Sequence, residues 1–267
     1  MENEKIIEVK NVTKKFDDFT AVDDVTFDVK RGEIFAFLGP NGAGKTTTIK
    51  MLTTLLGATS GQITIDGHDA SQDKNAARES FGIVFQDPSL DDELTAYENM
   101  YFHGVLYKVP KKVRDERIEQ LLKLVELWDR KDDFVKNFSG GMKRRLEIAR
   151  GLIHHPKILF LDEPTTGLDP QTRNYIWNYI QDLNKNEGIT VFLTTHYMEE
   201  AEKVASRIAI IDHGKIISMG TSQELKEQTK TENLEDAFLA LTGKQIREQA
   251  ASATDAMRQH RQMWRRR

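Results

Sequence analysis

Residues 39–47, with the sequence GPNGAGKTT, constrain the fold more than any other stretch of the chain. They follow an apolar run, residues 34–38, that has the length of a buried strand, and they lead into residues 47–52, whose spacing is helical. The spacing matches the phosphate loop G-x-x-x-x-G-K-[ST], and a strand before it and a helix after it are the context that this motif requires. The sequence therefore predicts an α/β fold that binds a nucleoside triphosphate.

Each residue type in this loop has a chemical reason. Glycines let the backbone curl until successive N–H groups point at a triphosphate, an approach that a Cβ atom would block. We expect Lys45 to reach the β- and γ-phosphates, the Thr46 hydroxyl to bind Mg²⁺, and the helix that begins near Gly44 to attract the anion with its positive end. The residues expected to contact the nucleotide here are Gly39, Pro40, Asn41, Gly42, Ala43, Gly44, Lys45, Thr46 and Thr47.

Length and composition limit the domain organisation and the cellular location that are expected for this chain. A chain of 267 residues exceeds the usual single domain, so we expect one large α/β domain with an inserted or appended subdomain. No stretch approaches the roughly 18 apolar residues of a membrane span, and the N-terminus lacks a signal-peptide pattern, which predicts a cytosolic protein unless a partner holds it elsewhere. The absence of cysteine excludes disulfides and thiolate metal sites. The net charge of −4 conceals a basic tail with six arginines in residues 247–267.

The rest of the chain predicts further strands and a helical insertion. Residues 6–9, 25–29 and 62–65 alternate between apolar and polar, as half-buried strands do, and we expect them to form a small antiparallel sheet. From about residue 95 to 128 the apolar spacing becomes helical. Several basic residues are interpreted as solvated helix faces: Lys108, Lys111, Lys112, Arg114 and the run 143–145.

Two acids, Asp162 and Glu163, follow another apolar run, residues 158–161. Carboxylates are rarely left unpaired at the end of a buried strand, so a cation or a catalytic task is the natural explanation. In phosphate-loop enzymes the aspartate after such a strand holds Mg²⁺, and we assign that role to Asp162. We expect Glu163, one residue on, to orient and deprotonate the attacking water.

Three other residues lie next to predicted strands, and each by itself gives weaker evidence of a function than the motifs above. Gln86 follows residues 82–85 and His196 follows residues 190–195, both at carboxyl ends, where α/β sheets bind ligands. Gln86 also fits a solvated loop, and His196 fits either a structural role or a hydrogen bond to a γ-phosphate. Phe16 could stack on an adenine ring, although from this residue alone an ordinary core or rim phenylalanine is preferred.

A second glycine-containing segment, FSGGM at residues 138–142, opens another predicted helix. Ser139 has the character of an N-cap. Gly140 and Gly141 each destabilise the first helical turn by roughly 1 kcal/mol relative to alanine, so a compensating role is expected. Two explanations of these glycines remain open: the exposed N–H groups could make a second phosphate contact, or the first turn could simply be loose. Asp169, before another predicted helix, fits a plain N-cap.

Taken together, these residues resemble the nucleotide-binding subunit of an ATP-binding cassette (ABC) transporter over residues 6–219. The resemblance rests on an ordered set of motifs: the phosphate loop, Gln86, the family signature as FSGGM, Asp162 with Glu163, residues 167–169 and His196. Phe138 and Met142 depart from the usual leucine and glutamine, while Ser139 and the second glycine are intact. These variants and residues 234–243 resemble the daunorubicin-resistance branch of exporters.

The resemblance implies a P-loop NTPase fold of the RecA type: a mostly parallel core sheet, an N-terminal antiparallel subdomain and a helical insertion at about 87–155. Residues 1–222 would form the cassette and residues 223–267 a C-terminal helical extension that ends in the basic tail. Two cassettes, as a homodimer or a heterodimer, would hold ATP and Mg²⁺ between the phosphate loop of one and Ser139, Gly140 and Gly141 of the other.

The resemblance also assigns individual roles. Phe16 would stack on adenine, Gln86 would link Mg²⁺ to the insertion that grips a membrane permease, and Asp169 and His196 would complete the two sites, with Lys45, Glu163 and His196 as catalytic residues. The implied function is ATP hydrolysis that energises a separate permease, on the inner face of the cell membrane, for export of a drug, lipid or polysaccharide.

Two alternatives fit the sequence less well. One is an ABC ATPase that acts on ribosomes or nucleic acid, but the chain has one cassette, no cysteine for zinc and no long coiled coil, so no nucleic-acid partner is expected. The basic tail alone leaves nucleic acid or anionic lipid open, beside a solvated helix. The other is a GTPase, but residues 184–187 lack the aspartate that would read guanine.

Overall fold

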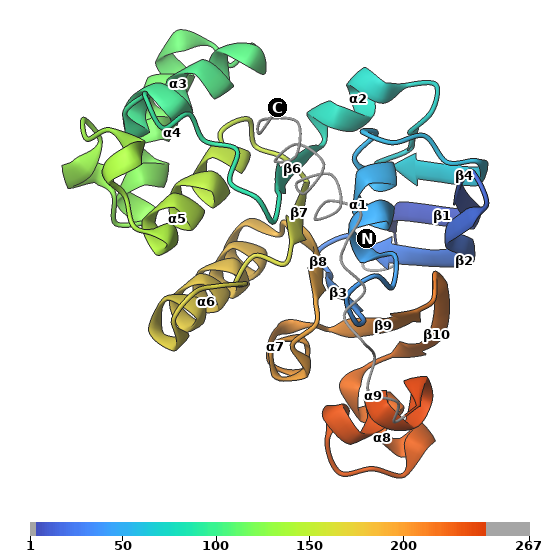
Figure 1. The fold of residues 1–267 in the computed structure, drawn as a ribbon. Helices are drawn as coiled ribbons and strands as arrows, with labels where there is room; N and C mark the ends of the chain where they lie inside the picture. Colours follow the sequence, from blue (N-terminus) through green and yellow to red (C-terminus); the bar gives the residue numbers. More distant parts are fainter. Residues whose placement is uncertain (1–3, 244–267) are drawn as a thin grey trace, which may run out of the picture.

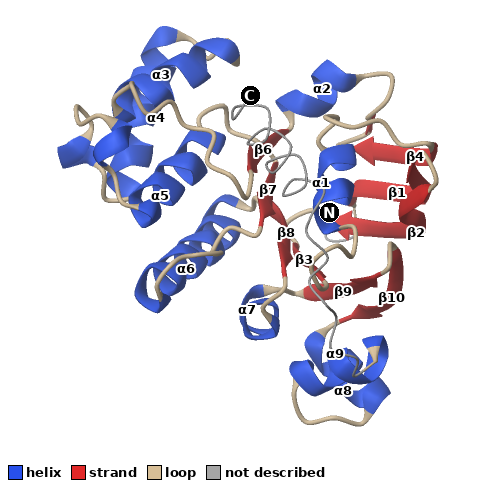
Figure 2. Cartoon of the chain, viewed as in Figure 1, coloured by secondary structure: helices blue, strands red, loops and turns tan. Residues whose placement is uncertain are grey.

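The computed structural model describes residues 4–243 of the chain, which fold around two β-sheets (Figures 1 and 2). The strands are β1 (Lys5–Phe16), β2 (Phe19–Lys30), β3 (Ile34–Leu38), β4 (Ser60–Ile65), β5 (His68–Asp69), β6 (Phe81–Val84), β7 (Ile158–Asp162), β8 (Thr190–Thr195), β9 (Arg207–Asp212) and β10 (Lys215–Gly220). The α-helices are α1 (Lys45–Leu52), α2 (Lys74–Glu79), α3 (Ala96–Leu106), α4 (Lys111–Leu124), α5 (Gly140–Gly151), α6 (Pro170–Glu187), α7 (Met198–Val204), α8 (Ser222–Thr229) and α9 (Leu234–Thr242). Two short 3₁₀ helices are η1 (Trp128–Arg130) and η2 (Val135–Asn137).

The larger sheet has six strands in the order β10-β9-β3-β8-β7-β6, and all but the edge strand β10 run parallel. The smaller sheet, β2-β1-β4-β5, is antiparallel. Parallel strands covered on both faces have continuous apolar sequences, which is why β3 and β7 show no alternation. The predicted fold, a mostly parallel core with an N-terminal antiparallel subdomain and inserted helices, is confirmed.

The six-stranded sheet divides the hydrophobic core into two parts. Phe35 and Phe37 of β3 lie on one face and contact Phe27 of β2 and Phe192 of β8, with ring centroids 5.5 to 5.7 Å apart. The alternate residues of β3 face the other part of the core, together with residues of α5 and α6. Because β3 is packed on both faces, the loop that follows it starts from a fixed point.

The first hairpin is longer than the sequence predicted. β1 and β2 have twelve residues each and stay paired as far as Phe16 and Phe19. Phe16 is therefore the last residue of β1. The alternating segments 6–9 and 25–29 cover only part of these strands because register shifts interrupt the alternation elsewhere.

The predicted helical region contains α3, α4 and α5, which Figure 1 shows gathered at the left, away from α1 and the smaller sheet. After β10, α8 and α9 pack near α7, and Glu202 of α7 lies 2.8 Å from Lys226 of α8 in an ion pair. The domain limits at 87, 155 and 222 remain predictions. The basic tail with its six arginines lies outside the described residues. No helix among residues 4–243 has the length and apolar character needed to cross a membrane.

Candidate functional site

The phosphate loop connects the carboxyl end of β3 to α1, as the sequence predicted. Gly42 and Gly44 have left-handed backbones, with φ of 79° and 105°. A Cβ atom at Gly44 would lie 2.6 Å from the Ala21 carbonyl oxygen, and one at Gly39 would lie 2.3 Å from the Ile211 carbonyl oxygen. The chain's own packing therefore requires these glycines. Within the described residues no side chain caps α1, which leaves the amides of its first turn available to an anion.

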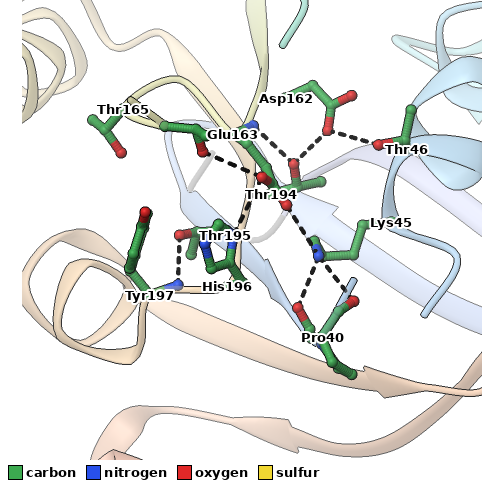
Figure 3. Close-up of polar contacts among 12 residues, drawn as sticks. Pro40, Lys45, Thr46, Asp162, Glu163, Thr165, Thr194, Thr195, His196 and Tyr197 are labelled. Carbon is green, nitrogen blue, oxygen red and sulfur yellow. Dashed lines mark hydrogen bonds and ion pairs between the residues drawn. The ribbon is translucent and has the colours of Figure 1, made fainter. Parts of the chain in front are cut away.

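Lys45 lies inside this loop. Its ammonium donates to the carbonyl oxygens of Gly39 at 2.8 Å and Pro40 at 3.1 Å, and lies 3.1 Å from Glu163 Oε1 (Figure 3). The side chain is 4% exposed. Burial lowers the pKa of Lys45, and the negative charges of Glu163 and Asp162 oppose that shift. The loop thus holds the Lys45 ammonium next to the position where phosphate oxygens are expected.

Thr46 and Asp162 meet at the same place although they are 116 residues apart in the sequence. Thr46 Oγ1 donates to Asp162 Oδ1 at 3.3 Å, and Thr194 Oγ1 donates to the same oxygen at 2.6 Å. Burial raises the pKa of Asp162, and the two threonine hydrogen bonds oppose that shift. Hydroxyl and carboxylate oxygens are ligands that Mg²⁺ prefers, so this pair fits the predicted metal.

Glu163 occupies a strained position directly after β7. Its φ of 47° is left-handed, which costs about 1 to 3 kcal/mol in a residue with a side chain and is typical of functional sites. Its backbone N–H donates to Thr194 Oγ1 at 3.0 Å, and its Oε2 lies 3.2 Å from His196 Nδ1. Burial acts to raise the pKa of Glu163, but the hydrogen bond to His196 and the charge of Lys45 outweigh it and lower the pKa to about 2. The carboxylate is ionised and held between two basic groups.

The two predicted N-caps form as expected. Ser139 Oγ accepts from the Met142 N–H at 3.2 Å at the start of α5, and Asp169 Oδ1 accepts from the Thr172 N–H at 3.0 Å at the start of α6. Ser139 and Gly140 are exposed. A Cβ atom at Gly141 would lie 2.7 Å from Thr172 Cγ2, so close packing against α6 is one reason for this glycine.

The site residues fall into two separate groups within one chain. Lys45, Thr46, Asp162, Glu163 and His196 meet at the carboxyl ends of β3, β7 and β8. The N-terminus of α5 belongs to the helical region at the left of Figure 1, whereas α1 lies on the other side of β7 in that view.

Gln86, just past β6, has an exposed side chain. Its loop is held by Arg144. The prediction that Arg144 lies on a solvated helix face is wrong. Arg144 is 6% exposed, donates to the carbonyl oxygens of Phe85 at 2.5 Å and Gln86 at 2.9 Å, and pairs with Glu147 at 3.1 Å. Burial lowers the pKa of Arg144, and the charge of Glu147 opposes that shift.

The same helix fixes the next part of this loop. The Ser89 N–H donates to Glu147 Oε1 at 2.7 Å, and Arg150 donates to the Ser89 carbonyl oxygen at 2.9 Å. Arg144, Glu147 and Arg150 alternate in charge at i, i+3 and i+6, which places them on one face of α5. This spacing is the sequence signal that could have predicted their interaction. Arg114 was also predicted to be solvated, but it is buried and its guanidinium lies 4.2 Å from the Tyr101 ring centroid.

The buried parallel strand β3 leads through a glycine loop that contains Lys45 into a helix. β7, separated from β3 by one strand, ends at Asp162, and Glu163 follows directly. This arrangement defines a P-loop nucleoside triphosphatase. A sequence model described as ABC transporter matches residues 22–166. The chain belongs to the ABC transporter family, as an ATP-hydrolysing ATP-binding subunit.

Characterised relatives and solved structures agree with this assignment. The chain is 42% identical over 220 residues to the linearmycin resistance ATP-binding protein LnrL of Bacillus subtilis. The matched region covers 82% of this chain and 70% of that protein. It is 42% identical over 222 residues to the daunorubicin/doxorubicin resistance ATP-binding protein DrrA of Streptomyces peucetius, which covers 83% of this chain and 67% of that protein.

Among solved structures, an ATP-binding subunit of an ABC transporter has a TM-score of 0.82 at 30% identity, over 89% of this chain and all of that one. The ATP-binding cassette MJ0796, a dimer in a post-hydrolysis state bound to ADP and Pi, has a TM-score of 0.73 at 29% identity, over 80% of this chain and 98% of that one. Cassettes of this family dimerise and work within membrane transporter complexes. The family predicted from the sequence motifs is confirmed.

Proposed function

We propose that two copies of this chain bind ATP and Mg²⁺ at their interface and energise a separate membrane permease that exports a drug-like molecule. The observation that carries the proposal is the separation of α5, which Ser139 and Gly140 open, from α1 and the phosphate loop of the same chain, together with the exposure of these two residues. A helix start with exposed amides suits a phosphate, and in a head-to-tail pair it would face the loop of the other copy.

In this proposal each residue near the ends of β3, β7 and β8 has a defined task. Lys45 contacts the β- and γ-phosphates, Thr46 and Asp162 hold Mg²⁺ with help from Gln86, and Glu163 takes a proton from the attacking water. His196, 3.2 Å from Glu163, orients that carboxylate and donates to the γ-phosphate. Mg²⁺ held by these residues would supply positive charge close to the phosphate oxygens.

The remaining nucleotide contacts are proposed from residues on both copies. The backbone of Gly39, Pro40, Asn41, Gly42, Ala43, Gly44 and Thr47 surrounds the phosphates, and Phe16 stacks on the adenine. Ser139, Gly140, Gly141 and Asp169 come from the other copy. Because γ-phosphate contacts from both copies exist only in the closed pair, ATP would stabilise closure and hydrolysis would release it.

The permease contact is proposed on α3. Phe102, Val105 and Leu106, at i, i+3 and i+4, lie on one face of this helix and are 51%, 45% and 76% exposed. An exposed apolar stripe of this kind is typical of a protein contact. The proposed location is the inner face of the cell membrane, where the permease holds the cassette. The names of LnrL and DrrA support an antibiotic-like substrate.

Mixed dimers test the shared site. One chain carries Ser139→Ala with Gly140→Asp. Position 140 is chosen because a Cβ atom there would lie 4.0 Å from Leu168 Cδ2, an ordinary contact, whereas one at 141 would lie 2.7 Å from Thr172 Cγ2. The other carries Lys45→Ala. Each variant alone should lack ATPase activity, and purified mixed dimers should regain up to about half of it, because one of two composite sites keeps both halves intact. Inactive mixed dimers of demonstrated composition would contradict a shared site.

A further inference from the structure

We propose that Glu200, on α7, is a positioning residue that fixes the two loops carrying Glu163 and His196 relative to each other. The inference rests on the roles proposed above for Glu163 and His196. Glu200 itself contacts neither of these side chains in the described structure; it acts through the residues beside them.

The carboxylate of Glu200 joins the two loops directly. Thr165 Oγ1 donates to Glu200 Oε1 at 2.7 Å and Oε2 at 2.9 Å, and Thr195 Oγ1 donates to Oε2 at 3.2 Å. Thr165 is two residues after Glu163, and Thr195 directly precedes His196. Glu200 is 5% exposed and each threonine is 1% exposed. One buried side chain thus connects the loop after β7 to the last residue of β8, which leads into His196.

Arg173 of α6 supplies the opposite charge and extends the connection. Its Nε lies 3.3 Å from Glu200 Oε1, and it donates to the Leu168 carbonyl oxygen at 3.4 Å. Its guanidinium lies 4.7 Å from the Tyr197 ring centroid, and that ring lies 4.1 Å from the His196 ring. The same unit therefore supports the imidazole from one side and the backbone next to Asp169 from the other.

The chemistry of this position requires a carboxylate. A buried charge is stable only when it is paired and hydrogen-bonded, and here two hydroxyls and a guanidinium meet that need. A carboxylate has two accepting oxygens, whereas a glutamine amide has one oxygen and an NH₂ group that cannot accept from a hydroxyl or a guanidinium. Glutamine of nearly the same shape would therefore loosen the connection without leaving a cavity.

Loosening should affect chemistry more than ATP binding. The contact between Glu163 and His196 is a single 3.2 Å pair, and a displacement of about 1 Å in a catalytic group can slow a reaction roughly 100-fold. Glu200 contacts residues 165, 173 and 195, and Arg173 extends the connection to residues 168 and 197. None of these residues belongs to the phosphate loop.

Glu200→Gln tests the inference, with Glu199→Gln as the control because Glu199 is the exposed neighbour on the same helix. We expect Glu200→Gln to lower kcat at least about tenfold while the Kd for ATP changes less than about twofold, and Glu199→Gln to change neither. Thr165→Val should behave like Glu200→Gln because it keeps the shape and loses the hydroxyl, and Thr165→Ser should keep activity. Wild-type kcat in both Glu200→Gln and Thr165→Val would overturn the inference.

A double-mutant cycle separates positioning from general structural damage. In a His196→Ala background, Glu200→Gln should lower kcat by less than about twofold, because the contact between Glu163 and His196 that it maintains is already gone. An undiminished tenfold loss there, or an equal loss of ATP binding, would overturn the inference. If Glu200→Gln does not fold, Thr165→Val in the same cycle gives the answer. Wild-type turnover in Glu163→Gln would instead refute the proposed function.

Discussion

The ammonium of Lys45 lies 3.1 Å from the carboxylate of Glu163, and both side chains are buried. The residue proposed to bind the phosphates therefore neutralises the residue proposed to activate water. Lys45 also donates to the Gly39 and Pro40 carbonyl oxygens. A triphosphate in the loop would offer Lys45 anionic oxygens in place of these partners. Nucleotide binding would then free Glu163, which links formation of the active base to the presence of substrate.

This pair leads to a prediction for Glu163→Gln. Turnover should fall at least about 100-fold, the lower end of what a positioned base contributes. ATP affinity should be kept or increase, because Lys45 no longer has to leave an ion pair. Phosphate release and equilibrium ATP binding measure the two effects. The control is Glu187→Gln, which removes a partly exposed carboxylate paired with Arg117 at 3.4 Å and should leave both unchanged. Near-normal turnover in Glu163→Gln would exclude it as the base.

The aromatic residue at the end of β1 provides a second prediction. Phe16 is 44% exposed, and Phe19, its partner across the hairpin, is 63% exposed. Stacking on a base is worth about 1 to 3 kcal/mol, so Phe16→Ala should raise the Kd for ATP by roughly 5- to 150-fold. Phe19→Ala removes the neighbouring ring as a control and should change the Kd less than about twofold. Equal effects of the two substitutions would argue that neither ring is the adenine platform.

The buried pair of Arg144 and Glu147 predicts a large loss of stability. Glu147 is 2% exposed, and burial raises its pKa against the opposing Ser89 hydrogen bond and the charge of Arg144. Arg144→Met removes the cation and should lower the free energy of unfolding by about 3 to 5 kcal/mol, as measured by urea unfolding without nucleotide.

Two companion variants make this prediction specific. Arg145→Met removes an ion pair with the exposed Glu126 and a hydrogen bond to the Val125 carbonyl oxygen at 2.8 Å, and should lower the free energy of unfolding by about 1 to 2 kcal/mol, less than Arg144→Met does. Arg144→Met combined with Glu147→Met should recover much of the loss, because an apolar pair of similar volume is often neutral. If Arg144→Met unfolds at the same urea concentration as the wild type, the pair does not stabilise the loop of Gln86 in the way described.

A fourth prediction concerns pH and His154, which lies three residues after the end of α5. Burial lowers the pKa of His154 to about 4, against the hydrogen bond from its ring to the Phe81 carbonyl oxygen. Between pH 6.5 and about 4 the unfolded chain binds a proton here that the folded chain does not bind. The free energy of unfolding should therefore fall as the pH drops through this window, by about 1.4 kcal/mol per unit at most.

Urea unfolding at pH 7.5 and pH 5 measures this dependence. His154→Phe should reduce it, because a phenyl ring keeps the stacking on Tyr107 and has no proton to bind. His213→Asn is the control, since His213 is exposed and asparagine tolerates its left-handed φ of 47°. An unchanged pH dependence in His154→Phe would assign the effect to other groups; His103, whose pKa burial lowers to about 3, is then the next to test.

Features that depend on neighbouring residues were predictable from the sequence. The phosphate loop, the parallel strands that end at Asp162 and Thr195, and the caps at Ser139 and Asp169 each depend on a few residues close together in the chain. Their spacing and residue types carry the information. The hairpin of β1 and β2 was only partly predicted because its register shifts break the pattern of alternation.

Features that depend on packing between distant segments were decided by the tertiary structure. A basic residue on a helix looks the same in sequence whether it is solvated or, like Arg144, buried against the carbonyl oxygens of another loop. The contacts of Lys45 with Glu163 and of Glu200 with Thr165 likewise join segments far apart in the chain. The sequence determined which chemical groups this protein has and on which strands and helices they lie. Only the packing of helices on the sheet determined which of those groups meet, because burial and pairing are properties of the folded chain as a whole.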